Sequence, residues 1–429
     1  MQAAAFSIAI VGAGPVGLAL ALQAAGALPQ ASIAVFDKRV AAQDVAGDPR
    51  TLALSLGSVQ QLERLGAWPR IEPRACAIGA VHVSQRQPSM LASFAATLGV
   101  AKPANAVRIT AADCGVELLG AVASYGAIVA PLQAAWLDAV AREPQRLAAR
   151  FGQAVAALKP LARGVEIDAG IAERFDLAVV AEGGVFSAQG AKSLDTSGRR
   201  TLRHDYRQTA WVGQVTLDRV AADEPGTAYE RFTPHGPAAL LPLPGDEGGR
   251  ARAALVWCVD AADDPVRSLD AAQRLAVLNS LFPAEAGRIV AVSALKDFAL
   301  GLDAQRSLVD AGAPIVRIGN AAQTLHPVAG QGLNLGLRDA HALVEALADA
   351  ARALRSTTGP IDLRSALARV ERERAPDRWA LIAATDFLAR SFTWQLPGLA
   401  SARGLGLLAL QSFGPAKRAL AQRMMFGLR

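Results

Sequence analysis

Three glycines near the start of the chain have the spacing of a phosphate-binding turn. Gly12, Gly14 and Gly17 form a GxGxxG pattern that follows a short apolar run and opens a stretch rich in Ala and Leu. The first glycine permits a tight turn, the second lets a pyrophosphate approach the backbone, and the third allows close packing of helix and strand. Free N–H groups at a helix start favour phosphate oxygens. The pattern therefore predicts dinucleotide binding.

Two strands and a helix must position this turn. Residues 6–11 and 32–36 have the apolar character of strands buried on both faces, and residues 15–27 form the helix between them. Asp37 ends the second strand, where a carboxylate can accept hydrogen bonds from an adenosine ribose. Glycines and a proline inside this uncharged first segment argue against a membrane-spanning helix, and the lack of a basic start argues against a signal peptide. The pattern fits NAD and FAD equally.

In two later segments an apolar strand is again followed directly by a glycine-rich turn or loop. Residues 176–184 are an apolar strand followed by Glu182, Gly183 and Gly184. Residues 317–336 are predicted to be a strand end, a loop and the start of a helix that continues to about Leu354. A glycine-rich loop that leads into a helix start directs N–H groups and positive potential at whatever lies in front of it. An isoalloxazine ring, which becomes anionic on reduction, is a suitable occupant.

Composition excludes several other classes of protein. The 429 residues suggest two or three domains, and 52% hydrophobic with 19% charged residues exclude a mainly disordered chain. The net charge of +6 is concentrated in residues 379–429, which hold six basic residues and one acid, and no basic stripe interleaved with aromatics points to nucleic acid. Three widely spaced cysteines and five histidines without ligand spacing argue against a disulfide framework and against a metal site.

The three motifs together resemble the group A FAD-dependent aromatic monooxygenases. Residues 48–55, 230–237 and 254–258 strengthen the match, which is similar to the ubiquinone-biosynthesis hydroxylases of the 2-octaprenyl-6-methoxyphenol type and covers nearly the whole chain. The resemblance implies an oxidoreductase with noncovalent FAD. It implies that NAD(P)H reduces the flavin, that O2 gives a flavin C4a-hydroperoxide, and that a polyprenylated phenol of ubiquinone biosynthesis is hydroxylated.

The resemblance also implies a set of cofactor-binding residues. These residues are Gly12, Gly14, Gly17, Asp37, Arg50, Gln133, Glu182, Asn320, Pro327, Gly330, Gly332 and Asn334. The last four would line the isoalloxazine. Glu182 and Asn320 depart from the usual Asp of their motifs, and the hydroxylase subgroup shares the Asn. Because the cofactor performs the difficult chemistry, no catalytic acid–base pair is expected.

The motif positions predict an α/β protein with a Rossmann-like FAD-binding domain that is discontinuous in sequence. An α+β substrate domain, with a strand meander at residues 229–259 and a helix capped by Asp270 and Gln273, would be inserted into it, and a helical region would end the chain. The predicted divisions are 1–75, 110–185 and 300–350 for the FAD-binding domain, 76–109 and 186–299 for the substrate domain, and 351–429 for the helical region.

Alternatives remain at this point. The substrate could be another aromatic compound, or the chain could be a flavin-binding assembly protein of a quinone-biosynthesis complex with little turnover. An apolar cluster at residues 405–413, flanked by Arg403, Lys417 and Arg418, indicates either contact with a membrane surface or a lipid-bound partner, or a helix packed on the FAD domain. The expected location is cytoplasmic and peripheral on the inner face of the membrane.

Overall fold

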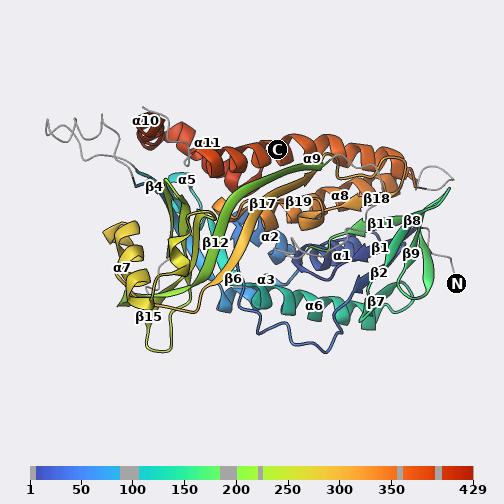
Figure 1. The fold of residues 1–429 in the computed structure, drawn as a ribbon. Coiled ribbons are helices and arrows are strands. Elements are labelled where there is room, and N and C mark those ends of the chain that lie inside the picture. The colour runs from blue at the N-terminus through green and yellow to red at the C-terminus, as the bar shows by residue number, and fades with distance from the viewer. Residues whose placement is uncertain are drawn as a thin grey trace.

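The computed structural model describes residues 6–86, 106–183, 201–220, 226–354, 361–391 and 399–428. Gly184 and parts of the segments 76–109 and 186–299 lie outside the described residues. The molecule is elongated, with a parallel sheet towards one end and a larger sheet towards the other (Figure 1). This is the mixed α/β architecture that the motif order predicts.

The five-stranded sheet carries the first two motifs. All its neighbouring strands are parallel, in the order β18 (Ile315–Arg317), β11 (Leu177–Val180), β1 (Phe6–Val11), β2 (Ala31–Asp37) and β7 (Leu147–Phe151). Alternate side chains of β1 point to opposite faces: Ile8 and Ile10 join a core with the helices, while Ala9 and Val11 join a core with the small sheet on the other side. Burial on both faces explains why the sequences of these strands are continuous apolar runs.

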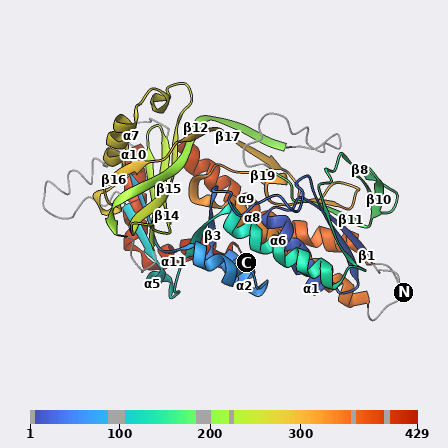
Figure 2. The same cartoon turned by 90° about the horizontal axis from the view of Figure 1, so that it is seen from below.

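Three helices and a small sheet cover the two faces of the parallel sheet (Figures 1 and 2). The helices are α1 (Pro15–Ala27), α6 (Tyr125–Arg142) and α8 (Gly332–Leu354), whose buried side chains share one core. The small antiparallel sheet consists of β8 (Ala157–Pro160), β9 (Val165–Asp168) and β10 (Ala172–Phe175). Layers on both faces are the arrangement that parallel strands require.

The larger sheet joins strands from distant parts of the chain. Its order is β19 (Gln323–Thr324), β17 (Lys296–Gln305), β12 (Thr201–Val220), β15 (Arg250–Asp260), β14 (Gly236–Leu243), β13 (Gly226–Thr233), β4 (Cys76–Gln85), β6 (Gly120–Ser124) and β3 (Thr51–Ser55). Two further strands pair at its sides, β16 (Ile289–Val292) with β12 and β5 (Ala106–Thr110) with β4. Strands from the expected FAD-binding segments thus pair with strands from the expected substrate segments. The domain division itself stays a prediction.

Short helices connect these strands, and a helical region ends the chain. The helix α7 (Ala271–Leu281) packs on one face of the larger sheet, and its start has the predicted capping box of Asp270 and Gln273. The other helices are α2 (Leu56–Arg64), α3 (Trp68–Ile71), α5 (Ala111–Cys114), α9 (Leu363–Ser391), α10 (Leu399–Ser412) and α11 (Gly414–Phe426). The helix α9 runs along the long axis of the molecule (Figure 1). Its side chains pack against residues of β17 and β12.

Most predicted elements are confirmed. The first strand and the first helix have the predicted bounds, and the meander is formed by β13, β14 and β15. His341 and Glu345 form an i, i+4 surface pair on α8, with 3.3 Å between Nε2 and Oε1. Cys258 is buried, whereas Cys76 and Cys114 are only partly covered, and all three are free thiols.

Candidate functional site

The glycine turn is shaped by direct contact between its own residues. Gly12 has φ +109°, a conformation that favours glycine. A Cβ atom added to Gly17 would lie 1.9 Å from the carbonyl oxygen of Gly12, so α1 can start against the turn only with glycine at this position. A Cβ atom on Gly12 would lie 2.8 Å from the backbone nitrogen of Glu182. The first motif is therefore packed against the end of β11, where the second motif begins.

Asp37 closes the same turn from the neighbouring strand. Its carboxylate accepts a hydrogen bond from Ala13 N at 2.6 Å and another from Arg39 N at 2.7 Å. The Arg39 guanidinium in turn donates to Ala13 O at 2.6 Å. Sequence reasoning missed Arg39, although a basic residue two positions after the acid was a visible signal. Together these side chains hold the turn in shape and place a positive charge beside it.

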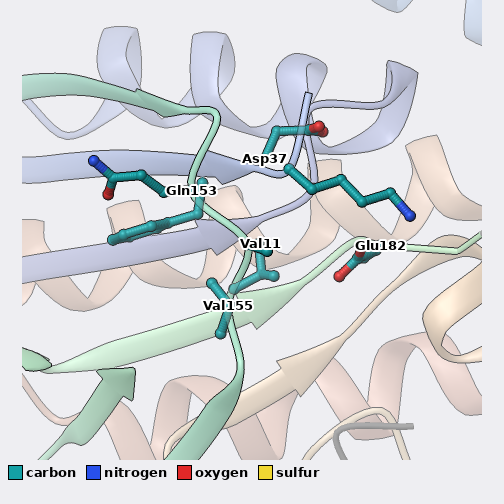
Figure 3. Close-up of a pocket in the computed structure, with 9 residues that line it drawn as sticks. Val11, Asp37, Gln153, Val155 and Glu182 are labelled. Carbon is teal, nitrogen blue, oxygen red and sulfur yellow. The ribbon is translucent and has the colours of Figure 1, made fainter. Parts of the chain in front are cut away.

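A hollow of about 240 Å³ opens between Asp37 and Glu182. Figure 3 shows Val11 between these two residues, at the ends of neighbouring strands, with Gln153 and Val155 on the segment that crosses them. Lys38 also lines the hollow. Carboxylates and an amide around an apolar floor suit a polar, hydroxyl-bearing ring such as a ribose. Residues 153–155 lie in a loop that carries no motif, so no sequence pattern indicated them.

Asn320 joins the second and third motifs. A Cβ atom on Gly183 would lie 2.4 Å from the Cβ of Asn320, and one on Gly332 would lie 3.9 Å from its Oδ1. A Cβ atom on Gly336 would lie 2.8 Å from Gly319, so the first turn of α8 sits directly on this loop. The structure thus brings Asn320, Glu182 and Gly332 together, as expected of residues that share one ligand. Their contacts with a cofactor stay a prediction.

Arg50 and Tyr125 lie on the other side of the glycine turn. The Arg50 guanidinium stacks over the Tyr125 ring at 4.1 Å and pairs with Asp48 at 2.7 Å, a hydrogen bond that raises the pKa of Arg50. The Tyr125 hydroxyl lies 3.7 Å from the position of a Cβ atom on Gly14. Gln133, on α6, is mostly buried and donates to Ala41 O at 3.1 Å, which ties α6 to the loop after β2.

Asn334 anchors the glycine-rich loop in front of α8. This side chain is 1% exposed, and its Oδ1 accepts from Ser55 N and from the Ser58 hydroxyl, both at 2.8 Å. Its Nδ2 donates to Ala53 O and to Gly330 O. The amide is therefore engaged by the chain's own atoms, and it fixes the loop against β3 and α2. Its expected place along the isoalloxazine stays a prediction.

His326 fixes the start of the same loop, which continues through Pro327. The imidazole is 2% exposed, and burial lowers its pKa to about 4, so it is neutral near pH 7. Its Nδ1 accepts from Val328 N at 3.2 Å, so Nε2 carries the proton and donates to Gln208 Oε1 at 2.9 Å. Gln208 belongs to β12, just after Arg207, which has φ +52° at an irregularity of the strand. This bond ties the loop to the larger sheet.

The residues around these motifs suit an FAD molecule. Within 4 Å, a Cβ atom on Gly14 or on Gly332 would meet only one side-chain oxygen, so the backbone at both glycines is open to a ligand. The long helix α8 starts at Gly332 and directs its positive end at this space. Beside the turn, Arg39 Nη1 is buried and makes no hydrogen bond within the described ranges. The residues present therefore match a dinucleotide with two phosphates and a ring that gains negative charge.

Other kinds of site find little support. Across the described parts of the chain, no group of three His, Cys, Asp or Glu side chains could hold a metal ion. Among the helices that the structure describes, none is long and apolar enough to cross a bilayer.

Comparison with known proteins gives relatives that cover either the whole chain or half of it. Residues 309–384 match the family described as FAD binding domain. An uncharacterized Synechocystis protein, slr1300, is 30% identical over 99% of this chain and 93% of its own length. The 3-demethoxyubiquinol 3-hydroxylase of Escherichia coli is 29% identical over 96% of each chain. The ubiquinone hydroxylase UbiL of Rhodospirillum rubrum is 37% identical, and that match spans 53% of this chain and about half of UbiL.

Solved structures share the fold at low identity. The p-nitrophenol 4-monooxygenase PnpA of Pseudomonas putida superposes with a TM-score of 0.70 over 98% of both chains, at 15% identity. HpxO of Klebsiella pneumoniae, solved with FAD and uric acid, gives 0.67 over 98% of this chain and 97% of its own, at 14% identity. These likenesses show the fold.

Proposed function

The chain belongs to the family of FAD-dependent aromatic monooxygenases that includes the ubiquinone-biosynthesis hydroxylases, and we propose that it hydroxylates a polyprenylated phenol on the route to ubiquinone. FAD is the cofactor, and the family's co-substrates are NAD(P)H and O2. The similarity to the 3-demethoxyubiquinol 3-hydroxylase over nearly the full length of both chains supports a phenolic quinone precursor as the substrate. The UbiL match, over half of that protein, adds a second hydroxylase of ubiquinone.

One observation carries the proposal. The glycine turn packs on the Glu182 turn, Gly183 packs on Asn320 beside the start of α8, and the loop before α8 also contacts the larger sheet through His326 and Val328. Bound FAD supplies the electron transfer and oxygen chemistry. The chain's own part would be to hold the phosphates at the turn, to fix the loop through Asn334, and to keep water from the reacting ring with the sheet that the loop contacts.

Two other functions make different predictions. A hydroxylase of another aromatic compound would consume NAD(P)H with that compound and ignore prenylated phenols. A flavin-binding assembly protein of a quinone-biosynthesis complex would show slow flavin reduction by NAD(P)H even with the substrate present. The direct cellular test is the quinone intermediate that accumulates when the protein is removed. A prenylated phenol that lacks one hydroxyl group supports the proposal, and an unchanged quinone pool contradicts it.

A polyprenyl substrate also suggests a peripheral location on the inner face of the membrane or in a quinone-biosynthesis complex. Leu405, Leu408 and Phe413 are 44%, 41% and 61% exposed, whereas Leu407 and Leu410 of the same helix pack on the core. Leu405 and Leu408 are thus available for the membrane or partner contact that the sequence allowed, whereas Leu407 and Leu410 pack on the protein, as the other alternative expects.

The charges that flank this apolar face differ from those expected. Lys417 is buried and pairs with Asp113 at 3.0 Å, and Arg403 donates to Ser391 O. The exposed cations here are Arg418 and Arg423. We expect flotation with anionic liposomes at low salt that is lost when Arg418 and Arg423 become Glu, because each basic residue near anionic lipid adds about 1 kcal/mol. The matched control is Arg372→Glu on the exposed side of α9, and equal flotation of all variants contradicts the membrane contact.

A further inference from the structure

The strand β13, near the middle of the larger sheet, presents alternate side chains to opposite faces. On β13, Tyr229 packs with α7 and its hydroxyl donates to Glu285 O, while Arg231 donates to Leu281 O at the end of α7. Phe232 belongs to the other face, where it packs with Val328 of the loop before α8. Because side chains alternate along a strand, Glu230 points to the same face as Phe232.

Glu230 lies between two clusters that cover this face. Ala228, two residues before it, packs with Ala421 and Met425 of α11, and Phe232, two residues after it, packs with Val328 and with Leu388 of α9. Side chains of α9 and α11 thus cover this face, whereas α7 packs on the opposite face. Glu230 thus lies two residues before Phe232, which contacts the loop that leads into α8 at the predicted FAD site.

The residues paired with Glu230 across the sheet carry no positive charge that could balance its carboxylate. Its strand partners are Ala239 on β14 and Val83 on β4, both apolar. Within the described ranges Glu230 has no hydrogen bond or ion pair, and it is half-buried. Burial raises its pKa to about 8.

Among the described residues, no charged group contributes to this shift in the pKa of Glu230. On β15, Cys258 has a thiol whose pKa is raised by burial and by the charge of Glu230. On the loop before α8, the neutral His326 is turned towards Gln208 of β12. Neither group is a cation that would hold Glu230 ionised, so the carboxyl group is free to exchange a proton with a ligand.

We propose that Glu230 is the catalytic residue that binds the phenolic hydroxyl group of the substrate and accepts its proton. This inference rests on the proposed function, since it supplies the acid–base group that the motifs did not identify. The O–H bond of the phenol breaks, a new O–H bond forms at a Glu230 carboxylate oxygen, and the electron pair stays on the phenol oxygen. That pair raises the electron density of the ring carbons ortho and para to it, where the new hydroxyl group is added.

The test compares the pH dependence of turnover and of binding. With a farnesylated methoxyphenol as probe, kcat/KM of the wild type should rise with pH and level off near pH 8, because the free carboxylate is the reactive form. Glu230→Gln keeps the size and removes the proton exchange, so this rise should vanish and kcat should fall about 10²–10³-fold. Glu247→Gln, an exposed acid in the turn before β15, is the matched control and should keep the wild-type profile.

Binding gives a readout that does not depend on turnover. Calorimetry should show that the probe binds more tightly than its O-methyl ether to the wild type, and that Glu230→Gln loses about tenfold of this preference. If Glu230→Gln keeps both the pH profile and the preference for the free phenol, Glu230 is not the proton acceptor. If the wild type turns over no phenol but shows the preference and Glu230→Gln lacks it, the proposed function fails while the binding role of Glu230 stands.

Discussion

The glycine turn and the Glu230 face of the larger sheet are built in opposite ways. The turn is encoded within 26 residues, from Gly12 to Asp37, and the contacts of Gly12, Gly17 and Asp37 are with near neighbours in sequence or with the second motif. The sheet face combines β13, β4, β15 and β12, which come from residues 76–260. A locally encoded turn suits a ligand that is the same in every relative, such as the dinucleotide phosphates. The residues of a face built from several strands can be replaced one at a time to suit a different substrate, because each strand contributes only one or two side chains.

The largest expected effect is on the turn. In Gly17→Val the new side chain would overlap the carbonyl oxygen of Gly12, so the turn must open. We expect FAD binding to fall below detection in a fluorescence titration, with a loss of about 1–3 kcal/mol in unfolding free energy. Gly26→Ala, in the same helix with nothing within 4 Å of the new Cβ, is the control and should bind FAD normally. Normal FAD affinity in Gly17→Val would show that the turn does not need this packing.

The link between loop and sheet should appear as a pH-dependent stability. The pKa of His326 is lowered from 6.5 to about 4, so the unfolded chain binds its proton first as the pH falls. Stability is therefore complete above about pH 6.5 and declines towards pH 4, by an amount on the order of 3 kcal/mol. Urea unfolding at several pH values should show this slope in the wild type and a flatter one in His326→Gln.

The surface histidine of α8 provides the control for that slope. His341→Gln alters only an exposed pair with Glu345 and should change the unfolding free energy by less than about 0.5 kcal/mol at any pH. An equal slope in His326→Gln and His341→Gln would contradict the assignment of the slope to the loop.

These two regions also differ in how far the sequence could predict them. The strand, turn and helix at residues 6–27 were predicted with their bounds, because glycine spacing and apolar runs act locally. The pairing that places Glu230 opposite Val83 joins strands far apart in sequence, and no local pattern encodes its register. The segment at 153–155 was missed for a related reason, since its role arises only when the loop after β7 crosses the turn. Arg39 was missed although its position two residues after Asp37 is a local signal.

A smaller effect is expected within the turn itself. In Asp37→Ala the hydrogen bonds to Ala13 N and to Arg39 are lost, which leaves the turn less ordered. Charge-assisted hydrogen bonds of this kind contribute about 1.5–3 kcal/mol, so FAD affinity should fall about 10- to 100-fold. Asp138→Ala, an exposed change on α6, should leave the affinity unchanged. A loss below threefold in Asp37→Ala would mean that Arg39 and the backbone hold the turn without the acid.

The most direct test of the central claim is the fate of molecular oxygen. The purified protein with FAD, NAD(P)H and a farnesylated methoxyphenol is allowed to react under ¹⁸O₂, and the products are analysed by mass spectrometry. An FAD-dependent hydroxylase inserts a single labelled oxygen atom into the phenol ring and forms little peroxide. Unlabelled phenol, with NAD(P)H left unused or all the label recovered as hydrogen peroxide, would contradict the account.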